Sequence, residues 1–209
     1  MNKPRLLDLF CCGGGAGMGY SLAGFEVVGV DIAPQSKYPF EFHQADALTF
    51  PLDGFDAIHA SPPCQAYTAA RHLQGNTHPE LIGPVRQRLF DSDLPWVIEN
   101  VVGAPLVNPV TLCGASFGLS VYRHRLFEAN FPIVEPTHPF HQWANVKMGR
   151  KPKGDEFIQP VGHFSDVPFA QKAMGIDWLG QEELREAIPP AYTQWIGLQM
   201  MAYVKRCAA

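Results

Sequence analysis

The sequence has no CxxC pair, no long apolar run and no excess of positive charge. Its five cysteines therefore favour a reducing compartment rather than a disulfide framework. Because an N-terminal apolar signal and an apolar span of about eighteen residues are both missing, we expect a soluble cytoplasmic protein with no membrane partner. A formal net charge of −4 excludes general attraction to nucleic acid, so such binding would need a local basic surface.

The chain is long enough for one catalytic domain with a small insertion. Its 209 residues, 46% of them hydrophobic, can bury an α/β core without disulfides or metals. No internal repeat or low-complexity tract is evident. The pattern predicts a doubly wound, mostly parallel sheet, with strands at about 5–10, 26–31, 55–61, 96–101 and 121–129.

The segment Pro62-Pro63-Cys64-Gln65 places a thiol directly after the predicted strand 55–61. Two prolines fix φ and remove two backbone donors, so the strand must end there in a stiff loop. Loops at strand ends often carry chemistry, which favours Cys64 as a nucleophile. The alternative is that Cys64 is a small buried hydrophobic residue. The polar connection over 66–95 is unusually long, and we interpret it as a lid ahead of a helix at about 80–90.

Glu99 interrupts the apolar segment 95–101, where an unpaired buried carboxylate would be unfavourable. It is therefore a candidate functional acid, although a helix cap or a salt bridge would also explain it.

A glycine-rich turn follows the first predicted strand, over residues 11–19. A short helix at about 20–23 and a second strand ending in Asp31 come next. This unit predicts a nucleotide-type site, with the Asp31 carboxylate accepting hydrogen bonds from a ribose diol. The turn does not spell GxGxxG, so the acid carries most of this argument.

Four motifs occur in an order that resembles the cytosine-C5 DNA methyltransferases, and compact bacteriophage-encoded members in particular. They are Asp8-Leu9-Phe10 with its glycine loop, Pro62-Pro63-Cys64-Gln65, Glu99-Asn100-Val101 and Arg123-His124-Arg125. The resemblance covers about 5–130 and returns at 188–192. It implies a Rossmann-like methyltransferase domain over 1–130 and 166–209, with a small target-recognition insertion at 131–165.

The resemblance implies methyl transfer from S-adenosyl-L-methionine to C5 of cytosine. A thiolate added at C6 makes C5 nucleophilic, and Cys64 takes that role. Glu99 stabilises the adduct at N3 and the exocyclic amine. Arg123 and Arg125 contact the flipped nucleotide, and a cation near Cys64 favours its thiolate. Without the motif context, the Arg-His-Arg segment would also fit a charged strand edge.

The same resemblance implies sets of cofactor and substrate residues. Asp46 is matched to the adenine amine, although it would equally fit a helix cap. Two departures from the family pattern are Cys12, where glycine is usual, and Val121, where glutamine is usual. The expected cofactor residues are Phe10, Gly13, Gly14, Gly15, Asp31, Ile32, Asp46, Ala47 and Pro63; the expected substrate residues are Ser61, Gln65, Asn100, Lys147, Arg150 and Lys151.

A basic cluster follows the arginine strand, where DNA-directed relatives place their recognition region. It contains Lys147, Arg150, Lys151 and Lys153, and it reads either as a phosphate contact or as a solvated loop. Trp143 and His141 beside it would stack on bases or anchor a small core. No metal site is predicted at His138 and His141, because no cysteine near them in the sequence completes a ligand set.

Three functions remain open. The first is a monomeric DNA cytosine-C5 methyltransferase of a bacterial or phage restriction-modification type, acting on double-stranded DNA with the target cytosine flipped out. The second is the same chemistry on RNA or a free nucleotide, because the motifs describe the base and not its carrier. The third is a DNA-binding regulator without turnover, against which the intact Cys64, Glu99, Arg123 and Arg125 argue.

Overall fold

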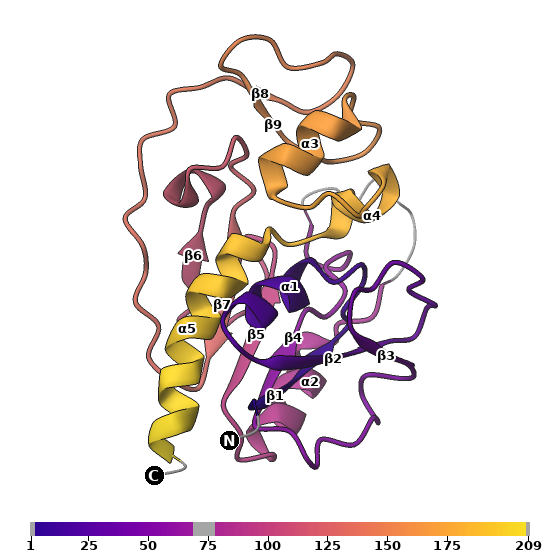
Figure 1. Cartoon of the computed structure of the whole chain (residues 1–209), viewed down its shortest axis with the longest axis vertical. Helices are drawn as coiled ribbons and strands as arrows, with labels where there is room; N and C mark the ends of the chain where they lie inside the picture. Colours follow the sequence, from indigo (N-terminus) through magenta and orange to yellow (C-terminus); the bar gives the residue numbers. More distant parts are fainter. Residues whose placement is uncertain (1–2, 69–77, 208–209) are drawn as a thin grey trace.

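A seven-stranded sheet forms the centre of the computed structural model, which describes residues 3–68 and 78–207 (Figure 1). The strand order is β3-β2-β1-β4-β5-β7-β6. The five strands from β3 to β5 are parallel, whereas β7 runs antiparallel to β5 and β6. This arrangement confirms the predicted doubly wound, mostly parallel sheet. The strands are β1 Arg5–Leu9, β2 Glu26–Asp31, β3 Glu41–Gln44, β4 Ala57–Ala60, β5 Trp96–Asn100, β6 Val110–Leu112 and β7 Arg125–Ala129.

Both faces of the sheet are buried, as is usual for parallel strands. Successive side chains of a strand point to opposite faces, so Leu6 and Leu7 enter different cores. The core on one side contains side chains of α1 (Gly15–Leu22) and α5 (Pro190–Cys207). The core on the other side contains side chains of α2 (Ile82–Phe90). The central strands can therefore be apolar along their whole length.

Helices α1 and α5 pack at very short range. A Cβ atom at Gly19 would overlap the Thr193 hydroxyl and the Pro190 carbonyl, so only glycine allows this approach. The Thr193 hydroxyl donates to the Ala16 carbonyl at 2.8 Å. One residue before Thr193, the Tyr192 hydroxyl donates to the carbonyl of Arg123 at 2.9 Å. Helix α5 therefore holds both the glycine loop region and the arginine segment.

A small second unit lies above the seven-stranded sheet in the view of Figure 1. Its strands β8 (Asn145–Val146) and β9 (Phe157–Ile158) are parallel, and α3 (Val167–Met174) and α4 (Gln181–Glu186) follow. Ile158 shares a hydrophobic cluster with side chains of α3 and α4 and with Val121. The core of this unit thus extends past residue 165, and the predicted insertion at 131–165 stays a prediction.

Several local predictions differ from the structure. Strands β3 and β6 were not expected, and residues 121–124 precede β7 without forming a strand. Helix α1 begins at Gly15, earlier than expected, because the glycine turn itself enters the helix. The helix expected at about 80–90 is α2. Residues 69–77 of the predicted lid lie outside the described residues.

The membrane prediction has one structural counterpart. Among the described residues, none of the helices combines the length and the apolar character that crossing a membrane requires.

Candidate active site

One cavity lies where the carboxyl ends of the parallel strands meet, which is the usual ligand position in an open α/β sheet. Its volume is about 260 Å³. Side chains converge on it from the turn after β1, the end of β2, the loop after β4, β5, the start of β7, the end of α4 and the segment that follows α4. The lining residues are Phe10, Cys12, Asp31, Ile32, Ser61, Pro62, Pro63, Cys64, Gln65, Glu99, Val101, Arg125, Arg185, Glu186 and Ile188.

The loop that carries Cys64 is anchored on both sides. Before it, the backbone N–H of Ser61 continues the sheet by donating to the Leu9 carbonyl at 3.1 Å. The Asn100 amide donates to the Pro62 carbonyl at 2.8 Å. After it, the Tyr67 N–H donates to the Cys64 carbonyl at 2.9 Å. The thiol therefore has a defined position in the cavity, as the two prolines predict.

Glu99 and Arg125 form an ion pair in this cavity. Arg125 Nε lies 3.1 Å from Glu99 Oε1, and the Glu99 side chain is only 6% exposed. Burial raises the pKa of Glu99, and the charges of Arg125 and Arg123 and the Ser61 hydroxyl oppose this rise. A carboxyl group with a raised pKa can hold a proton near neutral pH, which general acid catalysis requires.

The expected effect of an arginine on Cys64 is only partly met. The positive charge of Arg125 does lower the pKa of the thiol, but desolvation by burial is the larger effect and raises it overall. Glu99 raises it further. Arg125 therefore favours the thiolate, as expected of a nearby cation, but burial outweighs this effect and the pKa of the Cys64 thiol lies above its ordinary value.

A buried chain of polar groups reaches Glu99 from the opposite side. The Tyr20 hydroxyl lies 3.0 Å from His59 Nδ1, and His59 Nε2 lies 2.9 Å from the Ser61 hydroxyl. Ser61 in turn hydrogen-bonds to Glu99. Burial lowers the pKa of His59 to about 3, so its imidazole stays neutral and relays hydrogen bonds without adding a charge.

Asp31 fixes the turn after β1. Its Oδ2 accepts the backbone N–H of Cys12 at 3.0 Å, and its Oδ1 accepts the N–H of Ala33 at 2.9 Å. Cys12 has a positive φ of 44°, a conformation that favours glycine. This conformation explains why the resembled motif usually has glycine at the position of Cys12. The Asp31 carboxylate still lines the cavity, as predicted.

Asp8 has an oxygen without a hydrogen-bond partner. It is fully buried, and its Oδ2 accepts from the Tyr38 hydroxyl at 3.1 Å, whereas its Oδ1 accepts from nothing in the described part of the chain. Burial raises the pKa of Asp8 to about 7. A small cavity of about 30 Å³ lies beside it and the glycine loop. A buried orphan acceptor of this kind favours a ligand with a donor or positive group.

The three predicted loop glycines serve protein packing as well as the cavity. A Cβ atom at Gly13 would meet Leu179, one at Gly14 would meet Pro39, and one at Gly15 would meet the Ile188 carbonyl. Gly13 and Gly15 line the small cavity beside Asp8. Gly14 lines neither cavity but adopts φ 80° directly before α1. Its role in the described residues is conformational.

Asp46 and Ala47 do not line the cavity in the described chain, contrary to the prediction. Asp46 Oδ1 accepts the Leu48 N–H at 2.8 Å, and the Asp46 carbonyl accepts the Phe50 N–H at 3.0 Å. Local turn hydrogen bonds therefore account for this aspartate, in line with its capping alternative.

Arg123 is buried against backbone carbonyls and is absent from the described lining of the cavity. Its Nη1 donates to the Pro160 carbonyl at 3.1 Å, and its Nη2 donates to the carbonyl of Arg185. Burial and the nearby charge of Arg125 lower its pKa to about 9. In the described residues Arg123 joins the small unit to the sheet, and its contact with the flipped nucleotide stays a prediction. Val121, two residues earlier, lies in the hydrophobic core of that unit.

The predicted substrate residues divide into two groups. Ser61 and Gln65 line the cavity, and Gln65 Oε1 is buried without a partner in the described chain. Asn100 is outside the lining, because its side chain bonds to the Pro62 carbonyl and the Val101 N–H. Asn100 anchors the loop that carries Cys64, and its substrate contact stays a prediction.

The basic cluster is exposed but partly neutralised. Arg150 makes two hydrogen bonds to Glu156, at 2.5 and 2.6 Å. Lys151 Nζ lies 3.8 Å from Asp166. Lys147 and Lys153 are exposed and contribute the remaining positive charge. The cluster belongs to the small unit and does not line the cavity in the described residues.

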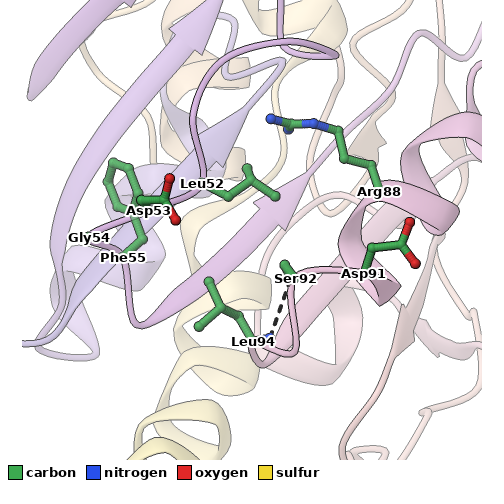
Figure 2. A pocket seen from close by; sticks show the side chains of 8 residues that line it. All are labelled: Leu52, Asp53, Gly54, Phe55, Arg88, Asp91, Ser92 and Leu94. Carbon is green, nitrogen blue, oxygen red and sulfur yellow. Dashed lines mark hydrogen bonds between the residues drawn. The ribbon is translucent and has the colours of Figure 1, made fainter.

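A second hollow, of about 480 Å³, lies at the opposite end of the sheet (Figure 2). It is formed by the segments that precede β4 and β5, with Arg88 and Asp91 from the end of α2. The Arg88 guanidinium extends away from Asp91 in Figure 2 and donates to the Ala47 carbonyl at 3.1 Å. The Arg88 side chain in this hollow therefore has a structural role, because it bonds to the backbone. In addition, sheets of this kind do not bind ligands at the amino ends of their strands.

Solved structures share this architecture over the whole chain. A prophage-encoded E. coli protein named as a DNA modification methyltransferase has a TM-score of 0.64 at 13% identity, covering 97% of this chain and 99% of its own. The S. pombe Dnmt2 methyltransferase also has a TM-score of 0.64 at 13% identity, with both chains covered by 100%. The Entamoeba histolytica methyltransferase EhMeth has a TM-score of 0.58 at 12% identity, again with 100% of both chains covered. The chain has the methyltransferase fold.

At this identity the likeness concerns the fold alone, and the predicted Rossmann-like methyltransferase class is thereby confirmed. No protein-family model matches the chain, and no curated protein matches its sequence. The methyltransferase fold nevertheless explains why the cavity lies where it does. Its sheet brings the ends of β2, β4 and β5 together, although these strands are far apart in the sequence.

Several lining residues were not predicted. Asp8 belongs to the motif Asp8-Leu9-Phe10, but the sequence predicts no role for it. Its unpartnered carboxylate oxygen is visible only in the structure. Arg185 and Glu186 come from the end of α4, and Ile188 comes from the short segment between α4 and α5. In the sequence, the motif at 188–192 is the only feature of this region that indicates a function. It predicts a helix and gives no sign that these residues line a cavity.

Proposed function

We propose that this chain transfers a methyl group from S-adenosyl-L-methionine to C5 of a cytosine in nucleic acid, through a covalent Cys64 adduct at C6. One observation carries the proposal: Cys64, Glu99, Arg125 and Asp31 line a single cavity at the carboxyl ends of the strands of a methyltransferase fold.

The residues around the cavity fit the cofactor. The Asp31 carboxylate faces the cavity at the end of β2, where it would accept hydrogen bonds from a ribose diol. The unpartnered Asp8 oxygen beside the glycine loop would accept from the amino group of the methionine moiety. Exposed Ile32 and the Phe10 ring supply apolar walls for the adenosyl part. When bound, S-adenosyl-L-methionine supplies an electrophilic methyl sulfonium group.

Cys64 activates the cytosine. Its sulfur adds to C6, which converts the ring to an enamine whose C5 is nucleophilic and would accept the methyl group that bound S-adenosyl-L-methionine supplies. C5 would then lose its proton to solvent as the C5–C6 double bond re-forms, and the C6–S bond would break to release the Cys64 thiolate. Because the resting thiol has a raised pKa, it must lose its proton once substrate is bound, and the Arg125 charge favours that ionisation.

Glu99 stabilises the adduct. Its raised pKa favours the protonated form, which can donate to N3 as electron density accumulates there during formation of the C6–S bond. Arg125 holds the Glu99 carboxyl group at 3.1 Å and retains further N–H donors for the O2 atom of the base. Arg123 contributes indirectly, by holding the segment that carries Arg125.

DNA is the proposed carrier of the cytosine, and it is double-stranded with the target base flipped out. The support is the DNA modification named for the prophage neighbour. RNA or a free nucleotide is the competing carrier, because the motifs describe the base and not what carries it. A net charge of −4 and the pairing of Arg150 with Glu156 weaken attraction to DNA and RNA alike, so of these two they favour the free nucleotide. A non-catalytic regulator is disfavoured, since it would not need Cys64 and Glu99 in one cavity.

The proposal is tested with labelled cofactor and three substrates: double-stranded DNA, tRNA and dCMP. DNA containing 5-fluorocytosine should become covalently attached to the protein, because fluorine at C5 cannot leave as a proton does. Cys64→Ser should abolish attachment. The matched control is Cys207→Ser, which changes an exposed cysteine at the end of α5 and should leave attachment unchanged.

Attachment in Cys64→Ser equal to that of the unmodified chain would remove Cys64 from the mechanism. Methylation of tRNA or dCMP but not of DNA would retain the chemistry and replace the carrier.

A further inference from the structure

Four potential metal ligands meet outside the cavity. The ligand atoms of Cys113, His124, His138 and His141 all lie within 4.8 Å of one another. Cys113 directly follows β6, and His124 directly precedes β7. His138 and His141 lie in the long connection between β7 and β8. The cluster thus joins three segments of the chain.

The spacing of these atoms is close to that of a tetrahedral zinc site. Cys113 Sγ lies 3.3 Å from His141 Nε2, and His124 Nε2 lies 3.1 Å from His138 Nε2. Zinc with N ligands at about 2.0–2.1 Å and S ligands at about 2.3 Å separates neighbouring ligand atoms by roughly 3.3–3.6 Å. Only small side-chain movements would be needed to bind the ion.

Among the described residues, hydrogen bonds link the cluster only in two pairs, His124 with His138 and His141 with Cys113. Three imidazoles direct Nε2 atoms toward one another or toward the thiol, and a neutral imidazole nitrogen either donates or accepts, but not both. The rings lie 4.8 to 5.3 Å apart between centroids. A cation would be approached by all four lone pairs at once, which explains why four such side chains converge.

The surroundings hold the ligands in place. Tyr122 stacks on His141 with ring centroids 3.7 Å apart, and its hydroxyl is bonded to the Trp143 backbone at 2.9 and 3.0 Å. Cys113 is fully buried, and the backbone N–H groups of Ala115 and Ser116 hydrogen-bond to its sulfur. Orienting contacts of this kind are typical around metal ligands.

We propose that Cys113, His124, His138 and His141 bind one Zn²⁺ ion. Thiolate and imidazole ligands in tetrahedral arrangement select zinc over magnesium or calcium. Four protein ligands leave no open position for water or substrate, so the site is structural. The earlier prediction of no metal considered only cysteines near His138 in the sequence, whereas Cys113 lies 28 residues before His141.

The site would position the catalytic segment. His124 lies between Arg123 and Arg125, so a metal bond to its Nε2 would hold the start of β7, where Arg125 meets Glu99. It would also tie the connection carrying His138 to the edge of the sheet. The proposal does not depend on methyl transfer, because a structural zinc would be bound whether or not the chain is active.

The test measures the metal directly. The chain is purified without a histidine tag, and its zinc content is determined by plasma mass spectrometry, with an expected ratio of one zinc per chain. The zinc is then removed with a chelator and replaced with Co²⁺. Tetrahedral cobalt should give intense visible bands, and a near-ultraviolet thiolate charge-transfer band should accompany them.

Three variants assign the ligands. Cys113→Ser should lose the charge-transfer band. Exposed His138→Gln should weaken zinc binding by about 100-fold or more, beyond the loss of about 10–100-fold that follows removal of an orienting partner. The matched control is His163→Gln, because His163 is an exposed histidine outside the cluster, and this variant should bind zinc normally.

Two results would overturn the proposal. One is purified protein without zinc whose metal-free form also gives no cobalt bands. The other is a His138→Gln variant that binds zinc as tightly as the unmodified chain. If Cys113→Ser does not fold, His138→Gln decides, because His138 is exposed and its replacement leaves the core intact.

Discussion

Replacing Glu99 with glutamine removes the acidic proton of this side chain and keeps its shape. Glutamine occupies nearly the same volume and retains an acceptor for Arg125, but it cannot donate a carboxylic acid proton to cytosine N3. The substitution therefore tests the acid role with little change in packing.

The expected loss of rate follows from that role. General acid catalysis contributes about 10²–10⁴ in rate, so we expect turnover to fall by about 10² or more. A factor of 10² corresponds to about 2.7 kcal/mol of transition-state stabilisation.

The stability of the variant is a separate quantity. Breaking a buried ion pair by removing one partner typically destabilises a protein by about 3–5 kcal/mol. Here Arg125 is 15% exposed and keeps a neutral acceptor, so we expect a smaller loss, of about 1–3 kcal/mol. The variant should therefore remain folded at 25 °C with a lower melting temperature.

Glu128 offers a matched control. Glu128 lies on β7, its side chain is 5% exposed, and it pairs at 2.7 Å with Arg86 of α2, outside the cavity. Glu128→Gln should lower stability by a similar amount and leave turnover per folded molecule nearly unchanged. Single-turnover methyl transfer, corrected for the folded fraction by circular dichroism, gives the comparison.

The pH profile adds a second test. Because burial raises the pKa of Glu99, its active protonated form is lost as pH rises through that raised pKa, and the rate should fall there. Glu99→Gln should lack this limb. Near-normal turnover in Glu99→Gln, or an equal loss in Glu128→Gln, would refute the reasoning.

Three further predictions concern the cofactor, an aspartate and the basic cluster. Asp31→Ala should weaken S-adenosyl-L-methionine binding by about 1.5–3 kcal/mol in calorimetry, because the ribose loses charge-assisted hydrogen bonds; exposed Asp53→Ala is the control, and equal affinities would contradict the assignment. Burial raises the pKa of Asp8 to about 7, so the folded chain keeps a proton that the unfolded chain releases above about pH 4. The free energy of unfolding should thus decrease by about 4 kcal/mol between about pH 4 and 7, and Asp8→Asn should remove this decrease in urea titrations; an unchanged profile would exclude it. Replacing Lys147, Arg150, Lys151 and Lys153 with glutamine should reduce the slope of the logarithm of DNA affinity against the logarithm of salt concentration by about 0.9 per lost phosphate contact. The total reduction should be smaller than four contacts would give, because Arg150 already pairs with Glu156. An unchanged slope and affinity would mean that this loop is only solvated.

The sequence was most informative where a few neighbouring residues decide the outcome. Two prolines before Cys64 end a strand whatever surrounds them, and the structure has the thiol in such a loop. The acid at the end of β2 was equally readable, since a strand, a glycine turn and Asp31 follow one another in order. The mostly parallel sheet followed from apolar strands alternating with helical segments.

Local patterns failed where a side chain had competing partners. Asp46 has the position of a cofactor acid in the resembled family, but the N–H of Leu48 occupies its oxygen. Arg123 belongs to the same motif as Arg125, yet its Nη1 and Nη2 atoms donate to the Pro160 and Arg185 carbonyls. The partners of Arg123 come from other segments, so its motif contains no sign of them, whereas Asp46 bonds to a residue only two positions away.

Only the tertiary structure decided which distant groups face one another. Glu99 meets Arg125 because β7 runs antiparallel to β5, and a shift of one residue in that register would turn one of the two side chains to the other face. Cys113, His124, His138 and His141 converge through the packing of three segments whose order in the sequence shows no metal motif. Backbone chemistry and side-chain periodicity act over a few residues and are therefore legible in the sequence. Register and burial depend on the packing free energy of the whole chain, so the raised pKa of Glu99, the orphan oxygen of Asp8 and the four-residue cluster became visible only in the fold.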